Sequence, residues 1–107
     1  MGQEKKLSIS AIQMCSKIGD KQANLEKVQG LVERDIKAGT DIIVLPEVWT
    51  VGWAPKHFRD SAEDINDSRT IDFLSKIARK HKTWIVGGSF ITKDREHYYN
   101  TCPVLNR

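Results

Sequence analysis

Glu47 is the residue with the clearest capacity for chemistry, because it follows Pro46 at the end of the apolar run formed by residues 41–45. In open α/β sheets the reacting groups gather beyond the carboxyl ends of the strands, where loops are rooted in a rigid sheet. A carboxylate held against Trp49 and Trp53 would lose hydration and become a better general base near neutral pH. The alternative is that Glu47 simply begins a solvated loop.

Other chemistries have weaker support in the sequence. Gly87 and Gly88 could let the backbone approach a ligand, but a Gly pair in a strand also fits a bulge or a packing contact. A nucleotide-binding α/β domain is another hypothesis, but the chain has neither a G-x-G-x-x-G motif nor a Walker loop. We expect no metal or other cofactor, since the histidines lack metal-ligand spacing with each other and with the cysteines. These histidines are His57, His81 and His97.

The two cysteines, Cys15 and Cys102, lie far apart in the sequence, and a single possible bridge is weak support for a disulfide scaffold. We therefore interpret both as reduced thiols. Cys15 lies where the first expected strand leaves the sheet, and Cys102 lies inside a later one. A catalytic thiol needs an activating base and usually an exposed turn or helix start, so we expect both to be buried and structural.

The first half of the chain alternates between strand and helix patterns. Residues 7–14 alternate as in a strand, and residues 19–40 repeat apolar side chains at helical spacing. Asp20 can cap the start of this helix and Gly39 can end it with a left-handed residue, while Gly30 inside it suggests a packing contact. Residues 41–45 are typical of a strand covered on both faces.

The next segment, residues 48–67, is long for a connector and is expected to be a loop that serves as a lid or wall. Residues 68–82 then show helical spacing, with Ser68 or Thr70 as the cap. The basic residues at 79–82 are explained by this helix, because positive charge in its last turn faces the negative end of the helix dipole.

The remaining residues predict two strands. Residues 83–91 form one, broken by Gly87 and Gly88, and residues 97–105 form the other after a polar turn at 93–96. Pro103 would lie at an edge or bulge. The order strand, helix, strand, helix, strand, strand indicates an α/β layered domain.

Composition bounds the possible partners and locations. The 107 residues form at most one domain, 1–107, and 39% apolar with 29% charged residues is a globular balance. The net charge is +3, and the basic residues are spread along the chain and interleaved with acidic ones. We therefore expect no nucleic acid partner. No run reaches the ~18 apolar residues of a membrane span, and MGQEKK lacks the apolar segment of a signal peptide. We expect a cytoplasmic protein that binds no membrane.

The motifs together resemble the N-terminal part of the nitrilase, or carbon–nitrogen hydrolase, superfamily. The matching features, in order along the chain, are AIQM, GDKQANLEK, AGTDIIVLPE, GW, IVGGSF and YYNT. The resemblance implies the N-terminal part of an α-β-β-α sandwich, in a homo-oligomer whose sheets continue into a symmetric dimer. It also implies hydrolysis of a small-molecule amide, nitrile or N-carbamoyl compound, with an amidase favoured over a nitrilase.

The same resemblance assigns roles to residues. Family members use a Glu-Lys-Cys mechanism, and the glutamate after Leu-Pro corresponds to Glu47, which would act as general base. Trp53 and Asn100 are the implied substrate-pocket candidates. The lysine and cysteine motifs have no counterpart before Arg107, so we expect this chain to carry only the glutamate and to be inactive alone. The alternative function is a non-catalytic interaction module that pairs through exposed sheet edges.

Overall fold

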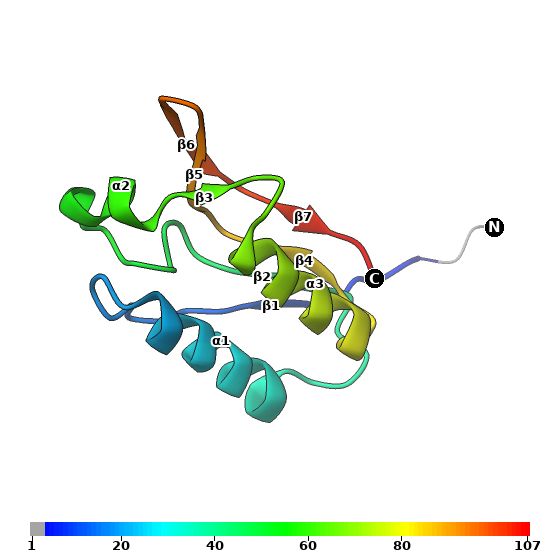
Figure 1. The fold of residues 1–107 in the computed structure, drawn as a ribbon. Coiled ribbons are helices and arrows are strands. Elements are labelled where there is room, and N and C mark those ends of the chain that lie inside the picture. Colours follow the sequence, from blue (N-terminus) through cyan, green and yellow to red (C-terminus); the bar gives the residue numbers. More distant parts are fainter. Residues whose placement is uncertain (1–3) are drawn as a thin grey trace.

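The computed structural model describes residues 4–107. Residues 1–3, part of the segment from which we expect no signal peptide, lie outside the described residues. Figure 1 shows two long helices packed on a sheet, with a hairpin projecting beyond it. The elements are β1 (Ile9–Ala11), α1 (Lys21–Asp35), β2 (Ile42–Val44), η1 (Pro55–His57), α2 (Phe58–Ser61), β3 (Glu63–Asp64), α3 (Arg69–His81), β4 (Trp84–Val86), β5 (Phe90–Asp94), β6 (His97–Thr101) and β7 (Val104–Leu105).

The main sheet has the strand order β1-β2-β4-β7. β1, β2 and β4 run parallel, and β7 pairs antiparallel with β4. Ile43 and Ile85 lie opposite each other in the central strands and are buried against α1 and α3. Leu25 and Val28 of α1 and Leu74 of α3 belong to the same core cluster, so both helices cover this face. The predicted α/β layered domain is confirmed.

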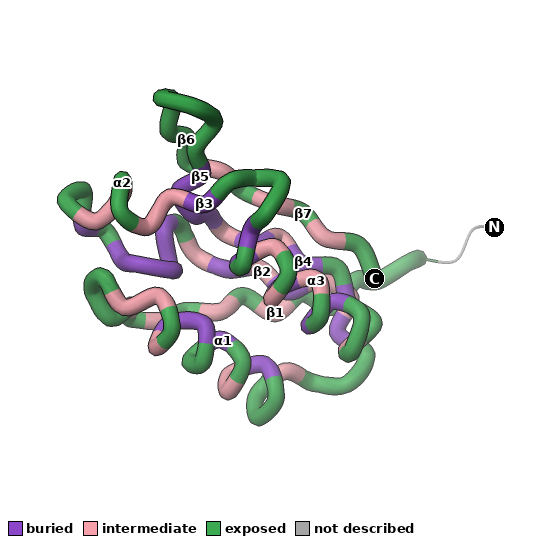
Figure 2. Tube along the Cα trace, in the orientation of Figure 1, coloured by how far each residue is buried: buried purple, intermediate pink, exposed green. Residues whose placement is uncertain are grey.

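The opposite face of the main sheet is apolar and open. Ile9 and Trp84 flank Ile42 in the register and are 58% and 42% exposed, and Val104 of β7 is 59% exposed. The expectation that residues 41–45 are covered on both faces is therefore wrong for the described residues. Figure 2 shows burial concentrated where the helices meet the sheet. Among the elements of residues 4–107, helices cover one face of this sheet and not the other.

A second sheet has the order β3-β5-β6, with β3 parallel to β5 and β5 antiparallel to β6. Each of the last two expected strands is split between the sheets: β4 leads into β5, and β6 leads into β7. The splits coincide in space, because the Gly87 amide donates to the Pro103 carbonyl at 2.8 Å. The strands are interrupted at Gly88, whose φ of +62° is not that of a strand, and at Pro103, which has no amide to donate to a sheet.

The ends of the long helices agree with the expected caps in two of three places. The Asp20 carboxylate accepts from the Ala23 amide and starts α1, and the Ser68 hydroxyl, rather than Thr70, accepts from the Ile71 amide and starts α3. The prediction for Gly39 is wrong, because α1 ends at Asp35. Gly39, with φ +84°, instead belongs to a separate turn.

The expectation of an irregular loop at residues 48–67 is also wrong in part. The segment contains the short helices η1 and α2 and the strand β3, which pairs with β5. Within residues 4–107 the fold brings together no group of metal-ligating side chains that could hold an ion. None of the helices in that range is sufficiently long and apolar to cross a membrane.

Candidate functional site

Glu47 lies just past the carboxyl end of β2, where the chain turns through residues 47–51. Its side chain is exposed, and among the described residues no hydrogen bond or ion pair involves its carboxylate. Trp49 is fully buried instead, and its indole Nε1 donates to the Gly87 carbonyl at 2.9 Å. The expected dehydration of Glu47 against Trp49 is therefore wrong, because Trp49 is part of the core.

The backbone on both sides of Glu47 is fixed even though its side chain is free. The Pro46 carbonyl accepts from the Ser89 amide at 3.2 Å, and the Val48 amide donates to the Ser89 Oγ at 2.8 Å. Val48 is buried and has φ +43°. This conformation is costly for a β-branched residue, roughly 1–3 kcal/mol, and such strain persists mainly where surrounding structure enforces it, often at functional sites.

Gly88 lets the chain approach this turn closely. With φ +62°, a Cβ on Gly88 would lie 2.0 Å from the Pro46 carbonyl oxygen and 2.8 Å from the Leu45 carbonyl carbon. Any larger residue would therefore push Pro46 away. Of the alternatives open for Gly88, the packing contact is the one found, and it holds the root of the Glu47 turn.

The far end of the turn is held by the first turn of α1 and by the segment that precedes it. Asn24 is buried and donates through Nδ2 to the Thr50 carbonyl at 2.8 Å. The Ser16 hydroxyl donates to the Trp49 carbonyl at 2.8 Å, and the Gly19 amide donates to the Val51 carbonyl at 2.9 Å. Sequence reasoning missed these supports, because isolated polar residues near a helix start show no spacing that indicates a distant partner.

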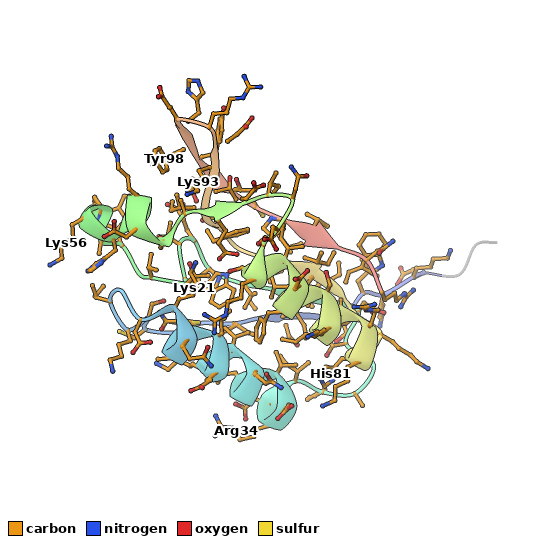
Figure 3. The ribbon with its side chains drawn as sticks, in the orientation of Figure 1. Lys21, Arg34, Lys56, His81, Lys93 and Tyr98 are labelled. Carbon is orange, nitrogen blue, oxygen red and sulfur yellow. The ribbon has the colours of Figure 1, made fainter. Side chains whose placement is uncertain are left out.

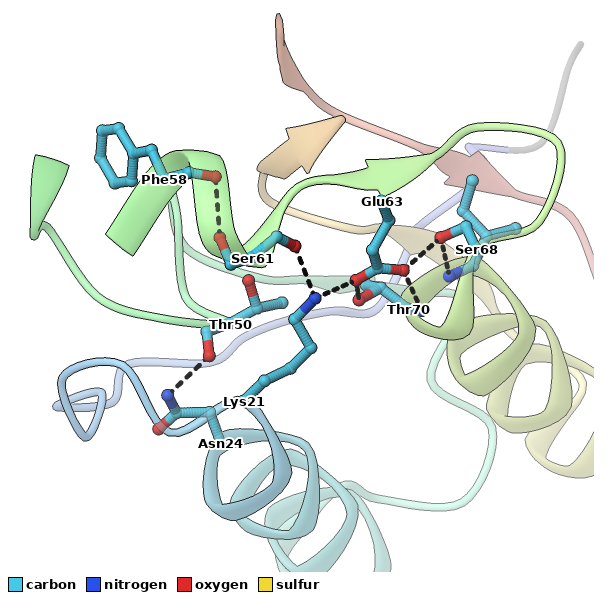
Figure 4. Close-up of polar contacts among 9 residues, drawn as sticks. Lys21, Asn24, Thr50, Phe58, Ser61, Glu63, Ser68 and Thr70 are labelled. Carbon is cyan, nitrogen blue, oxygen red and sulfur yellow. Dashed lines mark hydrogen bonds and ion pairs between the residues drawn. The ribbon is translucent and has the colours of Figure 1, made fainter. Parts of the chain in front are cut away.

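A second glutamate, Glu63, has the opposite surroundings. Lys21 reaches its Oε2 at 2.8 Å, Ser68 donates to its Oε1 at 2.7 Å, and Thr70 donates through both amide and hydroxyl. Lys21 also donates to the Ser61 carbonyl (Figure 4). Burial acts to raise the pKa of Glu63, but the hydrogen bonds from Lys21, Thr70 and Ser68 prevail and hold it below its ordinary value.

The Glu63 cluster ties α1, the segment after α2 and the start of α3 together. Sequence reasoning misses it, because the pattern of residues 48–67 predicts a loop. The one signal in the sequence is an acidic residue a few positions before a helix start rich in hydroxyl groups, at Ser68 and Thr70.

Trp53 and Asn100, the other expected site residues, are both exposed, and Trp53 lies in the bend before η1 whereas Asn100 lies on a strand. Trp53 is 67% exposed and packs edge-on against Phe58, with ring centroids 5.9 Å apart. Asn100 lies on β6 opposite Ile91 of β5. On the same hairpin Lys93 and Tyr98 lie opposite each other in the register, and Figure 3 shows this hairpin extending away from the long helices α1 and α3. No hydrogen bond within residues 4–107 joins Trp53 or Asn100 to Glu47.

Both cysteines are free and exposed. The expectation that they are buried is therefore wrong. Cys102 also lies between β6 and β7 rather than inside a strand, because the following Pro103 interrupts pairing there.

Comparison with known proteins finds a match to the family model described as carbon-nitrogen hydrolase over residues 8–107. The chain is 37% identical to the omega-amidase NIT2 of Bos taurus over 79% of this chain and 30% of that protein. It is 32% identical to the omega-amidase NIT3 of Saccharomyces cerevisiae over 94% of this chain and 37% of that protein. It is 31% identical to the 2-oxoglutaramate amidase of Bacillus subtilis over 95% of this chain and 39% of that protein.

Solved structures show the same fold. The crystal structure of Nit3 from Saccharomyces cerevisiae, a member of the nitrilase superfamily, matches with a TM-score of 0.83 at 29% identity, over 94% of this chain and 40% of that one. A CN-hydrolase superfamily protein from Xanthomonas campestris matches with a TM-score of 0.86 at 23% identity, over 96% of this chain and 37% of that one. The chain thus spans 30–39% of the length of the three curated relatives named above.

Proposed function

The chain belongs to the carbon–nitrogen hydrolase family, and on that premise we propose that Glu47 is the general base of a Glu-Lys-Cys hydrolase that cleaves a small-molecule amide. The observation that carries this proposal is an exposed carboxylate that has no partner within residues 4–107, on a backbone fixed from both sides at the end of the parallel strands. A base must be free to meet its proton donor yet held in place when it does so.

In the proposed reaction Glu47 accepts the proton of a cysteine thiol, and the thiolate attacks the amide carbon to form a C–S bond. Glu47 returns the proton to the leaving nitrogen as the C–N bond breaks, which releases ammonia. It then takes a proton from water, and the hydroxide attacks the thioester carbon. The C–S bond breaks, the carboxylic acid product leaves, and Glu47 returns the proton to the thiolate. A lysine stabilises the negative charge on the carbonyl oxygen. The cysteine and lysine are proposed to come from motifs not found among these 107 residues.

The proposed substrate is the terminal amide of a small 2-oxo dicarboxylic acid, an amidase substrate rather than a nitrile. The names of the relatives, omega-amidase and 2-oxoglutaramate amidase, support this class. Trp53 and Asn100 are proposed to contribute to the pocket, since both present polar or aromatic groups outside the core. We propose further that the working enzyme is a cytoplasmic homo-oligomer with no metal or cofactor.

Two assays of ammonia release test this function. The purified 107-residue chain is expected to release no ammonia from 2-oxoglutaramate above the buffer rate, because Glu47 has no matched thiol to deprotonate. A chimera in which this chain replaces the matched segment of the yeast NIT3 relative is expected to hydrolyse it. Hydrolysis by the chain alone that disappears in Glu47→Gln would refute the first expectation, and a folded but inactive chimera would refute the second.

The second candidate is a non-catalytic module that pairs with another copy of this chain, and the open apolar face of the main sheet favours it. Ile9, Trp84 and Val104 on that face have no cover among residues 4–107. Gel filtration tests whether this face pairs, and ammonia release by the chimera distinguishes this candidate from the hydrolase. A dimer that Trp84→Lys converts to a monomer would support the module, and a monomer at micromolar concentration would count against it.

A further inference from the structure

We propose that Ser89 is the residue that positions Glu47, a conclusion that rests on Glu47 acting as the base. Ser89 is 6% exposed and bonds to the residues on both sides of Glu47. Its amide donates to the Pro46 carbonyl at 3.2 Å, and its Oγ accepts from the Val48 amide at 2.8 Å. The side chain and the backbone amide of Ser89 therefore hold the two residues next to Glu47, and no hydrogen bond from Ser89 reaches the Glu47 carboxylate.

The bond from Val48 is the part that a serine side chain specifically supplies. Val48 is buried, so an amide with no acceptor there would be unpaired and costly. Its backbone also lies in the left-handed region, which a valine leaves readily when nothing enforces it. Loss of the Ser89 oxygen would remove the acceptor that stabilises this conformation, and the backbone of Glu47 would shift with it.

Ser89 is itself anchored to the second sheet. The next residue, Phe90, begins β5, is buried and pairs with Thr101 of β6. On its other side Gly88 packs directly on the Pro46 carbonyl. Ser89 thus connects the Glu47 turn of the main sheet to the second sheet, whereas Asn24 and Ser16 support only the far end of the turn.

Hydrogen exchange of the 107-residue chain, followed by NMR, tests this role. The reference is the Leu45 amide, which donates to the Val86 carbonyl at 2.9 Å at the end of β2. In Ser89→Ala the exchange rate of Val48 relative to Leu45 is expected to rise at least about tenfold. The backbone resonances of Glu47 are expected to shift as well. Ser89→Thr, which keeps the hydroxyl, is expected to restore both readouts.

Ser68→Ala is the matched control, because Ser68 is also a buried serine. Its hydroxyl oxygen accepts a hydrogen bond from a backbone amide at the start of α3. It is expected to lower global stability without changing the Val48-to-Leu45 ratio or the Glu47 resonances. If Ser89→Ala does not fold, Ser89→Cys replaces it, because a thiol has a similar shape to the hydroxyl but is a weak acceptor. The same exchange ratio and Glu47 resonances are then compared. An unchanged ratio with unshifted Glu47 resonances would overturn the proposal, whatever the ammonia assays show.

Discussion

Glu47 and Glu63 are two glutamates of one small chain in opposite situations. Glu63 is buried, paired with Lys21 and saturated with hydrogen bonds from the start of α3. Glu47 is exposed and has no partner for its carboxylate among residues 4–107, yet its neighbours Pro46 and Val48 are both held by Ser89. A carboxylate whose acceptor sites are filled stabilises the fold, whereas one left open on a strained backbone is available for chemistry.

Gly88→Ala should break the Glu47 side of this comparison with the largest effect. The new Cβ would meet the Pro46 carbonyl and would also require a left-handed alanine, so we expect the free energy of unfolding to fall by about 4 kcal/mol. Urea denaturation measures it.

Gly30→Ala is the control for that substitution. Gly30 lies inside α1, and the nearest atom to its Cβ would be the flexible guanidinium of Arg34 at 3.4 Å, so the packing contact expected for Gly30 is not found. Alanine there should stabilise the chain by about 0.5–1 kcal/mol. A Gly88→Ala variant as stable as the parent would contradict the described approach of Gly88 to Pro46.

Glu63→Ala should remove the stabilisation that the Glu63 cluster provides. It would leave the Lys21 ammonium half-buried without its partner and remove acceptors from Ser68 and Thr70, so a loss of about 3 kcal/mol is expected in the same denaturation experiment. Glu33, which pairs with Lys80 on the surface at 3.4 Å, is the control, and Glu33→Ala should leave stability nearly unchanged. Equal losses in the two variants would mean that burial of Glu63 is irrelevant.

Acid should reduce the contribution of Glu63 to the free energy of unfolding. Its pKa is lowered in the folded state, so its stabilisation is present above the unfolded value near 4.5 and is lost as pH falls through the folded value. The difference in unfolding free energy between the parent and Glu63→Gln should therefore be constant above about pH 5.5 and shrink below pH 4.5. A difference that grows on acidification would have the wrong sign for this cluster.

Glu47→Gln should have the smallest effect on stability. Its side chain is exposed and unpaired within the described residues, so we expect the unfolding free energy to change by less than about 0.5 kcal/mol. A loss comparable to that of Glu63→Ala would show that Glu47 is structural and would remove the contrast between the two glutamates.

Local patterns were sufficient to predict the two long helices, the parallel strands β1, β2 and β4, and the position of Glu47 just after β2. Asp20 and Ser68 lie at helix starts where their side chains accept free amides, and Pro46 ends a strand because it has no amide to donate. Gly39 misled the placement of one helix end, since a left-handed glycine fits any turn. The α/β class followed from the order of these elements.

Contacts between distant segments were not predictable in the same way. Lys21 and Glu63 are 42 residues apart, and Val48 and Ser89 are 41 apart, and no periodicity relates such pairs. The burial of Trp49 was missed for a similar reason, because its partner, the Gly87 carbonyl, comes from a backbone break between two sheets. These long-range bonds are what distinguish the two glutamates.

Ammonia release by the chimera with the yeast relative, compared between Glu47 and Glu47→Gln, tests the central claim most directly. Loss of a positioned general base should lower kcat for 2-oxoglutaramate by about 1000-fold, while the unfolding free energy stays within about 0.5 kcal/mol. An active chimera in which Glu47→Gln retains kcat within about threefold would show that Glu47 is not the base.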